Sequence, residues 1–349
     1  MRKITDFEGL TCSGDTTISD VIKRIDNSTP LLFQLILDDA RRVVGTVTDG
    51  DIRRGFARGL QLDSPVKGCM HFPPVIGGIA DGLLNRERLV GRRFLPVCDA
   101  DGTLNHILAE IDTPSRAERA LIVAGGFGTR LGEMTKSIPK PLIHVGGKPM
   151  LEHILERLEN YGIKRVDISV HFLADQIENF INQRDNRCEI TIVHENEPLG
   201  TAGSLGLINQ PLSEPILLLN ADVLTDVDLN SLVEHHARLE CDGSIAATRY
   251  EHQVPYGVLR FDDSDTLLGI EEKPTYYHLV SAGIYYLNPS IVRLVAPGER
   301  IDIPELFELA VKNGMRLTVF PVHEYWSDVG HPTDLEIADL FHKERSNGK

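Results

Sequence analysis

The stretch AGGFGTRLGEMTKSIPKPL, residues 124–142, holds four glycines, one arginine and two lysines. It follows the short apolar run RALIVA (119–124), which is typical of a buried strand. Four apolar residues within 151–158 then have the i, i+3, i+4, i+7 spacing of an amphipathic helix. A strand, a glycine-rich loop and a helix in this order predict the start of an α/β unit.

The chain beyond this loop alternates between strand-like and helix-like segments. Strands are predicted at 165–171, 188–193 and 215–222, and a helix at 173–181. This alternation predicts an α/β fold with a Rossmann-like, mixed but mostly parallel sheet that is covered on both faces. Ligands bind such sheets at the carboxyl ends of the strands, so the glycine-rich loop should lie at the binding edge.

The first 115 residues have a different pattern. The segment LILDDARRVVGTVTDGDIRR (35–54) has a weaker echo in LPVCDADGTLNHIL (95–108), and each copy predicts a strand, an Asp-rich turn and a second strand. This repeat indicates a small, duplicated α+β module. The polar segment AEIDTPSRAE (109–118) is predicted to be a linker. We therefore expect two domains, at 1–115 and 118–349.

Composition excludes several classes of protein. The 349 residues carry a formal net charge of −15, which argues against non-specific nucleic-acid binding. No apolar run reaches the roughly 20 residues of a membrane span, and the N-terminus lacks the apolar region of a signal peptide. The five cysteines are scattered without CxxC spacing, which predicts a reduced, cytoplasmic protein without a zinc site.

The glycine-rich loop matches neither of two common phosphate-binding motifs. It lacks the G-x-x-x-x-G-K-[ST] pattern, and Leu131 stands where G-x-G-x-x-G needs its third glycine. Glycines nevertheless let backbone N–H groups cradle an anion. Arg130 can bind phosphate with two hydrogen bonds, and Lys140 is held between two prolines. The loop with its two cations therefore suits a triphosphate.

Several landmarks together resemble the sugar-1-phosphate nucleotidyltransferases. GGFGTRL with PKPL is similar to that family's signature, and later segments follow in family order: EPLGTAGSL (197–205), NADV (220–223), YGVL (256–259), EEKP (271–274), SAGIYYL (281–287) and WSDVG (326–330). The resemblance covers nearly all of 119–335. It implies a GT-A-like nucleotidyltransferase fold and transfer of a nucleotidyl group to a sugar 1-phosphate, with pyrophosphate released.

The resemblance also implies roles for individual residues. Arg130, Lys140 and Lys273 would be the catalytic cations. Asp222 and Asp328 would bind Mg²⁺, which prefers few carboxylates together with phosphate oxygens. The implied nucleotide-binding residues are Ala124, Gly125, Gly126, Gly128, Thr129, Glu195, Gly200 and Thr201. The implied sugar-phosphate residues are Gly257, Glu272, Lys273 and Tyr285.

Glu195 bears on the choice of base. Family members that use uracil or thymine often carry Gln at this position, whereas a carboxylate accepts from both N1–H and the 2-amino group of guanine. We therefore expect GTP, with UTP and CTP as alternatives. The arrangement of a small duplicated module ahead of the transferase is similar to the glucosamine-1-phosphate guanylyltransferases of legionaminic acid synthesis, and mannose 1-phosphate and heptose 1-phosphate are alternative substrates. A phosphorylated non-sugar alcohol and an inactive nucleotide-sensing scaffold are the other hypotheses.

The N-terminal module resembles a pair of cystathionine-β-synthase (CBS) motifs. VVGTVTDGDIRRGF (43–56) is similar to the end of such a motif, and the second copy is degenerate, with Asn105 where Gly is usual. The resemblance implies a regulatory nucleotide at Thr48 and Asp51, with a ligand-free assembly module as the alternative. CBS pairs commonly self-associate, so we expect a homo-oligomer.

Overall fold

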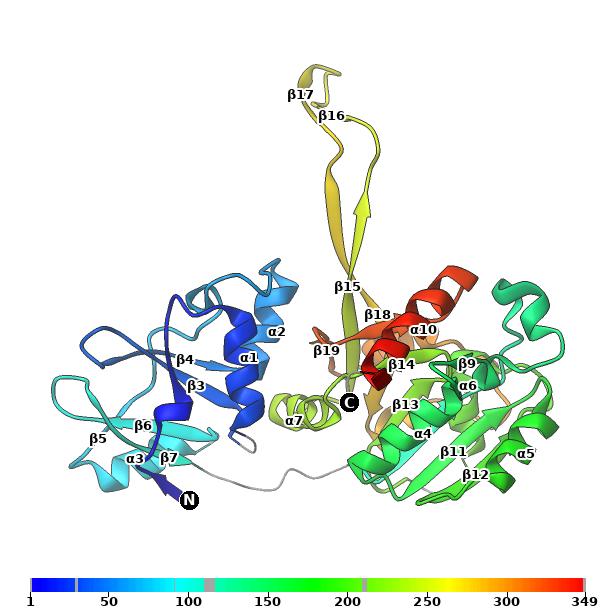
Figure 1. Ribbon diagram of the computed structural model, residues 1–349, viewed down its shortest axis with the longest axis horizontal. Coiled ribbons are helices and arrows are strands. Elements are labelled where there is room, and N and C mark those ends of the chain that lie inside the picture. The colour runs from blue at the N-terminus through cyan, green and yellow to red at the C-terminus, as the bar shows by residue number, and fades with distance from the viewer. Residues whose placement is uncertain (1, 29–30, 91, 110–116, 209–211, 348–349) are drawn as a thin grey trace. The chain divides into compact units, whose positions relative to one another are not determined.

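The computed structural model describes residues 2–28, 31–90, 92–109, 117–208 and 212–347, which fold as two units (Figure 1). The units are Met1–Thr113 and Pro114–Lys349. The predicted linker, 109–118, falls mostly outside the described residues. Among the described residues, no helix is both long and apolar enough to cross a membrane. All five cysteines are free thiols.

A seven-stranded mixed sheet organises the C-terminal unit, and the predicted fold class is confirmed. Its strands lie in the order β12-β11-β8-β13-β18-β15-β19. The first four are parallel, β18 is antiparallel to both of its neighbours, and β19 is parallel to β15. Their bounds are β8 Arg119–Val123, β11 Arg165–Val170, β12 Glu189–His194, β13 Ile216–Asn220, β15 Gly243–Gln253, β18 Thr275–Leu287 and β19 Leu317–Pro321.

Helices cover both faces of this sheet because alternate residues of each strand point to opposite sides. Leu217 and Leu219 of β13 join a core with α4, α5 and α7, whereas Leu218 joins a second core with α8 and α9. The helix bounds are α4 Met150–Tyr161, α5 Ala174–Gln183, α6 Gly200–Gly203, α7 Leu229–Leu239, α8 Pro289–Val292, α9 Ile303–Lys312 and α10 Pro332–Asn347.

Local sequence explains where two of the helices begin and end. The predicted apolar positions of α4 are all buried, and the helix ends at Gly162, whose φ of 102° is readily adopted by glycine. Asp228 is the N-cap of α7, and its side chain accepts from the backbone N–H of Asn230 at 2.9 Å.

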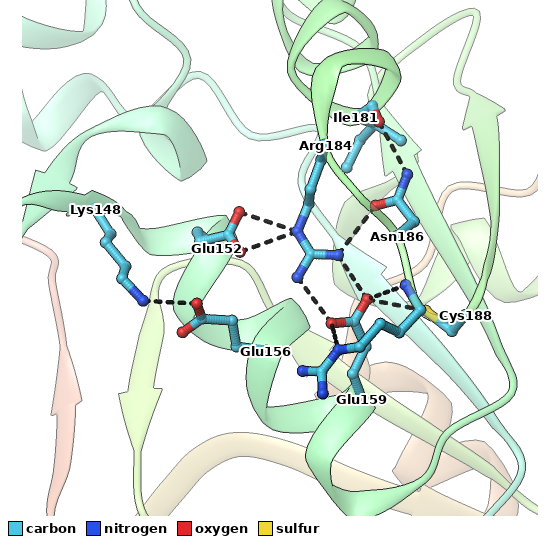
Figure 2. Close-up of polar contacts among 9 residues, drawn as sticks. Lys148, Glu152, Glu156, Glu159, Ile181, Arg184, Asn186 and Cys188 are labelled. Atoms are coloured by element: carbon cyan, nitrogen blue, oxygen red, sulfur yellow. Dashed lines mark hydrogen bonds and ion pairs between the residues drawn. The ribbon is translucent and has the colours of Figure 1, made fainter.

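An ion-pair network ties α4 to the segment between α5 and β12 (Figure 2). Arg184 donates to Glu152 and to Glu159, with its Nη1 2.6 Å from Glu159 Oε1. The backbone N–H of Arg187 also donates to Glu159, at 2.9 Å. Both oxygens of the buried Glu159 carboxylate thus have partners, and these contacts hold the segment before β12 against α4.

A two-stranded extension leaves the sheet where β15 and β18 continue past their neighbours. These two strands pair with each other as far as Gln253 and Thr275. The short hairpin of β16 (Val258–Phe261) and β17 (Leu267–Glu271) then forms the far end of the extension (Figure 1). Residues 248–280 are called the arm below.

The N-terminal unit contains the two predicted strand–turn–strand copies. One is β3 (Phe33–Leu37) with β4 (Val43–Thr48), and the other is β6 (Phe94–Cys98) with β7 (Leu104–Ala109); both pairs are antiparallel. The first copy belongs to the sheet β2-β3-β4 and the second to the sheet β1-β7-β6-β5. The remaining elements are β1 Arg2–Ile4, β2 Thr11–Ser13, α1 Ile18–Asn27, α2 Asp49–Ala57, β5 Gly77–Gly78 and α3 Gly82–Leu89.

Candidate active site

The glycine-rich loop begins at the carboxyl end of the central strand β8. The backbone N–H of Ala124 still donates to Ser169 of β11, at 2.9 Å, and the chain then leaves the sheet. Gly128 has a φ of +62°, and a Cβ there would lie 2.9 Å from Thr135. The hydroxyl of Thr135 lies 3.0 Å from the Gly128 carbonyl oxygen and holds the loop closed. Sequence reasoning missed Thr135, because nothing in its local pattern indicates this contact.

Lys140 reaches back under the loop to the end of another strand. It belongs to a short 3₁₀ turn, Lys140–Leu142, and its side chain is 10% exposed. Its Nζ donates to Asp222 Oδ2 at 2.6 Å. A predicted phosphate-binding cation and a predicted metal ligand, 82 positions apart, therefore form one ion pair.

Asp222 and Asp328 are brought together by the short antiparallel pair β14 (Val223–Thr225) and β20 (Trp326–Asp328). Val223 stands opposite Asp328 in this pair, and the N–H of Val329 donates to the Asp222 carbonyl oxygen at 3.0 Å. Among the described residues, Oδ1 of Asp328 is buried and has no hydrogen-bond partner. Burial, and then the charge of Asp222, raise the pKa of Asp328 despite the opposing charges of Lys140 and Arg130.

Arg130 lies against the last residue of the WSDVG segment. A Cβ on Gly330 would be 3.2 Å from Arg130 Nη1 and 3.7 Å from Asp328 Oδ1. The absence of a side chain at Gly330 therefore lets the guanidinium approach the carboxylate. The structure thus gathers four predicted site residues, Arg130, Lys140, Asp222 and Asp328, and we call them the open cluster.

Glu195 lies beside the glycine-rich loop, next to Gly125. It is buried, so it is not a solvated charge at a strand end. Its Oε2 accepts from the backbone N–H of Leu199 at 3.0 Å, while Oε1 is buried without a partner among the described residues. A Cβ on Gly125 would lie only 3.1 Å from this Oε1. A buried carboxylate oxygen beside the loop therefore still lacks a donor.

The other predicted nucleotide residues have different surroundings. The hydroxyl and backbone N–H of Thr201 both donate to Asp302, the N-cap of α9, and Gly200 lies against the Ile301 carbonyl group. These contacts give Thr201 and Gly200 a structural role in docking α9. Gly126 and Thr129 are exposed on the loop, and Ala124 is buried beneath it.

The predicted sugar-phosphate residues do not join the open cluster in this chain. Gly257, Glu272 and Lys273 are exposed on the arm. Ser281 pairs with Ala247, the last residue of β15 that also pairs with β19, and extended chain from Lys273 to Ser281 spans roughly 26 Å. The paired strands of the arm therefore hold these residues away from Asp222. Tyr285 lies in the second core, and its hydroxyl is 2.8 Å from the Ser281 hydroxyl.

The two residues predicted to bind a nucleotide in the CBS module form hydrogen bonds with each other. Thr48 is the N-cap of α2 and forms a capping box with Asp51, whose other oxygen accepts from Arg54. A cavity of ≈ 460 Å³ in the same unit is lined instead by residues of 76–81 and 98–100 together with Arg88. Thr48 and Asp51 thus have a structural explanation, and their nucleotide role stays a prediction.

The open cluster fits a divalent cation on the chemistry of its donors. Two carboxylates lie side by side, and one of their oxygens is buried without a partner. Mg²⁺ needs only one or two protein carboxylates as ligands, because substrate phosphates and water supply the others. Among the described residues, no group of three or more His, Cys, Asp or Glu side chains forms a complete protein cage.

Family comparison covers both units. The Nucleotidyl transferase family model matches residues 119–345, and the CBS domain model matches residues 4–58. Because the first match spans well over half of the 349 residues, the chain belongs to the nucleotidyl transferase family. The predicted resemblance is thereby confirmed, and the CBS match falls on the first of the two predicted motifs.

Individual relatives are similar over less than two thirds of this chain. Mannose-1-phosphate guanylyltransferase catalytic subunit beta of Drosophila pseudoobscura pseudoobscura is 35% identical over 230 residues, 64% of this chain and 62% of that protein. Probable mannose-1-phosphate guanylyltransferase 1 of Oryza sativa subsp. japonica is 34% identical over 226 residues, 62% of each chain. The chain therefore spans less than two thirds of the length of these relatives.

Solved structures are similar over the same share of the chain. The crystal structure of HddC from Yersinia pseudotuberculosis has a TM-score of 0.51 and 27% identity, and covers 64% of this chain and 99% of that chain. A second structure of HddC, complexed with GMP-PN, has the same TM-score and 26% identity.

Proposed function

We propose that this member of the nucleotidyl transferase family transfers a guanylyl group from GTP to a sugar 1-phosphate and releases pyrophosphate. The observation that carries the proposal is the open cluster, in which Lys140, Asp222 and Asp328 meet below a glycine-rich loop. Two anionic substrates need cations, which Arg130 and Lys140 supply in a chain of net charge −15, together with the divalent cation that the two carboxylates would hold.

The proposed reaction is an in-line displacement. A phosphate oxygen of the sugar 1-phosphate attacks the α-phosphorus of the nucleotide, and the bond to the leaving pyrophosphate breaks. Arg130 holds the triphosphate and the departing pyrophosphate, and Lys140 offsets negative charge at the α-phosphate. Asp222 and Asp328 would hold Mg²⁺, which when bound neutralises developing charge and orients the phosphates.

Two findings support guanine as the base. Glu195 has a buried oxygen without a partner next to the loop, and guanine offers two adjacent N–H donors to such a carboxylate. The similar HddC is known in complex with GMP-PN, and the similar Drosophila and rice proteins are named guanylyltransferases.

The sugar is a separate part of the proposal. The resemblance to the CBS-fused guanylyltransferases favours glucosamine 1-phosphate, whereas the names of the Drosophila and rice relatives favour mannose 1-phosphate. Gly257, Glu272 and Lys273 would have to approach the open cluster to contact either sugar. The five free cysteines suit a cytoplasmic enzyme.

The test is pyrophosphate release with each of four nucleoside triphosphates and a panel of glucosamine, mannose and heptose 1-phosphates. We expect the highest kcat/KM with GTP, and we expect Glu195→Gln to reduce the preference for GTP over UTP by about 1–3 kcal/mol. The exposed Glu197 supplies the control, since Glu197→Gln should leave the preference unchanged. Equal kcat/KM for UTP and GTP would refute the assignment of guanine as the base. If no combination of nucleoside triphosphate and sugar 1-phosphate released pyrophosphate, the proposed transferase activity would be refuted.

A further inference from the structure

Glu195, the residue proposed to bind guanine, is held by its neighbours at three of its polar atoms. Its backbone N–H donates to the Val170 carbonyl oxygen at 2.9 Å, and its Oε2 accepts from the N–H of Leu199. Its backbone carbonyl oxygen accepts from Nδ1 of His171 at 2.9 Å, since a carbonyl group cannot donate. Of the polar atoms of Glu195, Oε1 alone has no partner among the described residues. These contacts fix the residue and leave one oxygen for a ligand.

His171 also contacts the glycine-rich loop, through the ring of Phe127. The two rings meet edge to face, with centroids 5.7 Å apart and planes at 86°. The ring of Phe172 lies against Phe127 as well, with centroids 5.4 Å apart. Phe127 comes two residues after Gly125, the glycine next to Oε1 of Glu195. One histidine therefore contacts both the residue with the unpartnered oxygen and an aromatic ring of the loop.

Packing within the chain leaves much of the Phe127 residue uncovered. It contacts two rings, yet it is 46% exposed. A Cβ on the preceding Gly126 would meet nothing within 4 Å, so there is open space beside this part of the loop. A nucleobase has a flat apolar face and a polar edge. An exposed aromatic ring and a carboxylate oxygen beside the same loop suit these two parts of a base.

We infer that Phe127 packs against the face of the nucleotide base, and that His171 is a positioning residue that holds both Phe127 and Glu195. The inference rests on the proposed use of GTP, whose guanine edge donates to Glu195. Every base has an aromatic face, so stacking adds affinity without selecting one base. Hydrogen bonds to the edge select the base. Phe127 should therefore set the affinity for nucleotide, and His171, acting through Glu195, should set the preference for guanine.

Calorimetric titration of the full-length protein tests the role of Phe127. Phe127→Leu keeps an apolar side chain without an aromatic face, and we expect it to raise the Kd for GTP roughly tenfold. Phe127→Tyr keeps the ring and should change this Kd by less than about twofold. Tripolyphosphate has no base, so its Kd should stay the same in both variants. An unchanged Kd for GTP in Phe127→Leu, or an equal loss of affinity for GTP and tripolyphosphate, would overturn the stacking role.

The same titration with GTP and UTP tests the role of His171. His171→Ala removes the donor to the Glu195 carbonyl group, so the preference for GTP over UTP should fall about fivefold. In a Glu195→Gln background the same change should have a much smaller effect, because His171 acts through Glu195. His194→Ala is the matched control, since His194 immediately precedes Glu195 and its side chain is 59% exposed. Equal effects of His171→Ala in both backgrounds, or an equal effect of His194→Ala, would overturn the positioning role.

Binding measurements separate this inference from the proposed guanylyl transfer. If GTP binds and the variants behave as expected, but no pyrophosphate is released, only the proposed transfer is refuted. If pyrophosphate is released while Phe127→Leu and His171→Ala bind nucleotides as the unmodified protein does, only the present inference is refuted. A protein that does not bind GTP would refute both.

Discussion

Two charged clusters in the C-terminal unit differ in whether their charged groups have hydrogen-bonding partners. In the network of Arg184 with Glu152 and Glu159, every charge is paired, and Glu159 accepts from two arginines (Figure 2). In the open cluster, Asp328 keeps a buried oxygen without a partner. Pairing lowers the pKa of Glu159 to about 2, whereas burial raises that of Asp328. The first arrangement stabilises the fold, and the second leaves a position for a ligand.

The largest expected effect is on activity at the open cluster. Asp328→Asn removes a charged ligand, so turnover should fall by about 100- to 10,000-fold, roughly 3–5 kcal/mol in the barrier. The same change should raise the Tm, because the folded protein no longer bears an unfavourably buried negative charge. Asp222→Asn should show the loss of turnover too. Pyrophosphate release and thermal unfolding measure both effects, and full activity in either variant would exclude that residue from the metal site.

The next effect is on stability, at the paired network. Glu159→Gln leaves the Arg184 guanidinium short of a counter-charge, and should lower the free energy of unfolding by about 3 kcal/mol. Activity below the melting transition should stay near that of the unmodified protein, because the network lies outside the open cluster. Urea unfolding measures the change, and an unaltered midpoint would contradict the structural role of the network.

The pH dependence separates this role from a simple packing defect. The pKa of Glu159 is lowered from 4.5 to about 2, so its contribution is complete above pH 4.5 and is lost as pH falls towards 2. The difference in stability between the unmodified protein and Glu159→Gln should therefore shrink from pH 6 to pH 3. A difference that stays constant over this range would point to packing alone.

The smallest effect belongs to an exposed ion pair between Lys148, which precedes α4, and Glu156 on that helix. Lys148 Nζ is 2.6 Å from Glu156 Oε1, and the two side chains are 50% and 37% exposed (Figure 2). Lys148→Gln should change the free energy of unfolding by less than about 0.5 kcal/mol, because solvent screens the pair. Urea unfolding measures this change as well. If Lys148→Gln lowered the free energy of unfolding as much as Glu159→Gln does, burial would not explain the difference between the two ion pairs.

The sequence alone determined the architecture and the family. Buried strands, helix spacing and the glycine-rich loop are local patterns, and their order along the chain predicted the mixed sheet and its binding edge. Asp228 could also be predicted as a helix cap, because capping depends on neighbouring residues. Thr48 and Asp51 show the limit of this reasoning, since one local motif fits both a helix cap and a nucleotide site.

Only the tertiary structure decided which predicted residues meet. Lys140 and Asp222 pair across 82 positions, and Asp328 joins them through the β14–β20 pair, because strand order sets contacts that no local period encodes. The same pairing rules keep Lys273 on the arm and away from that cluster, although its motif resembles a sugar-phosphate site. The arm exists because β15 and β18 continue to pair with each other beyond the rest of the sheet.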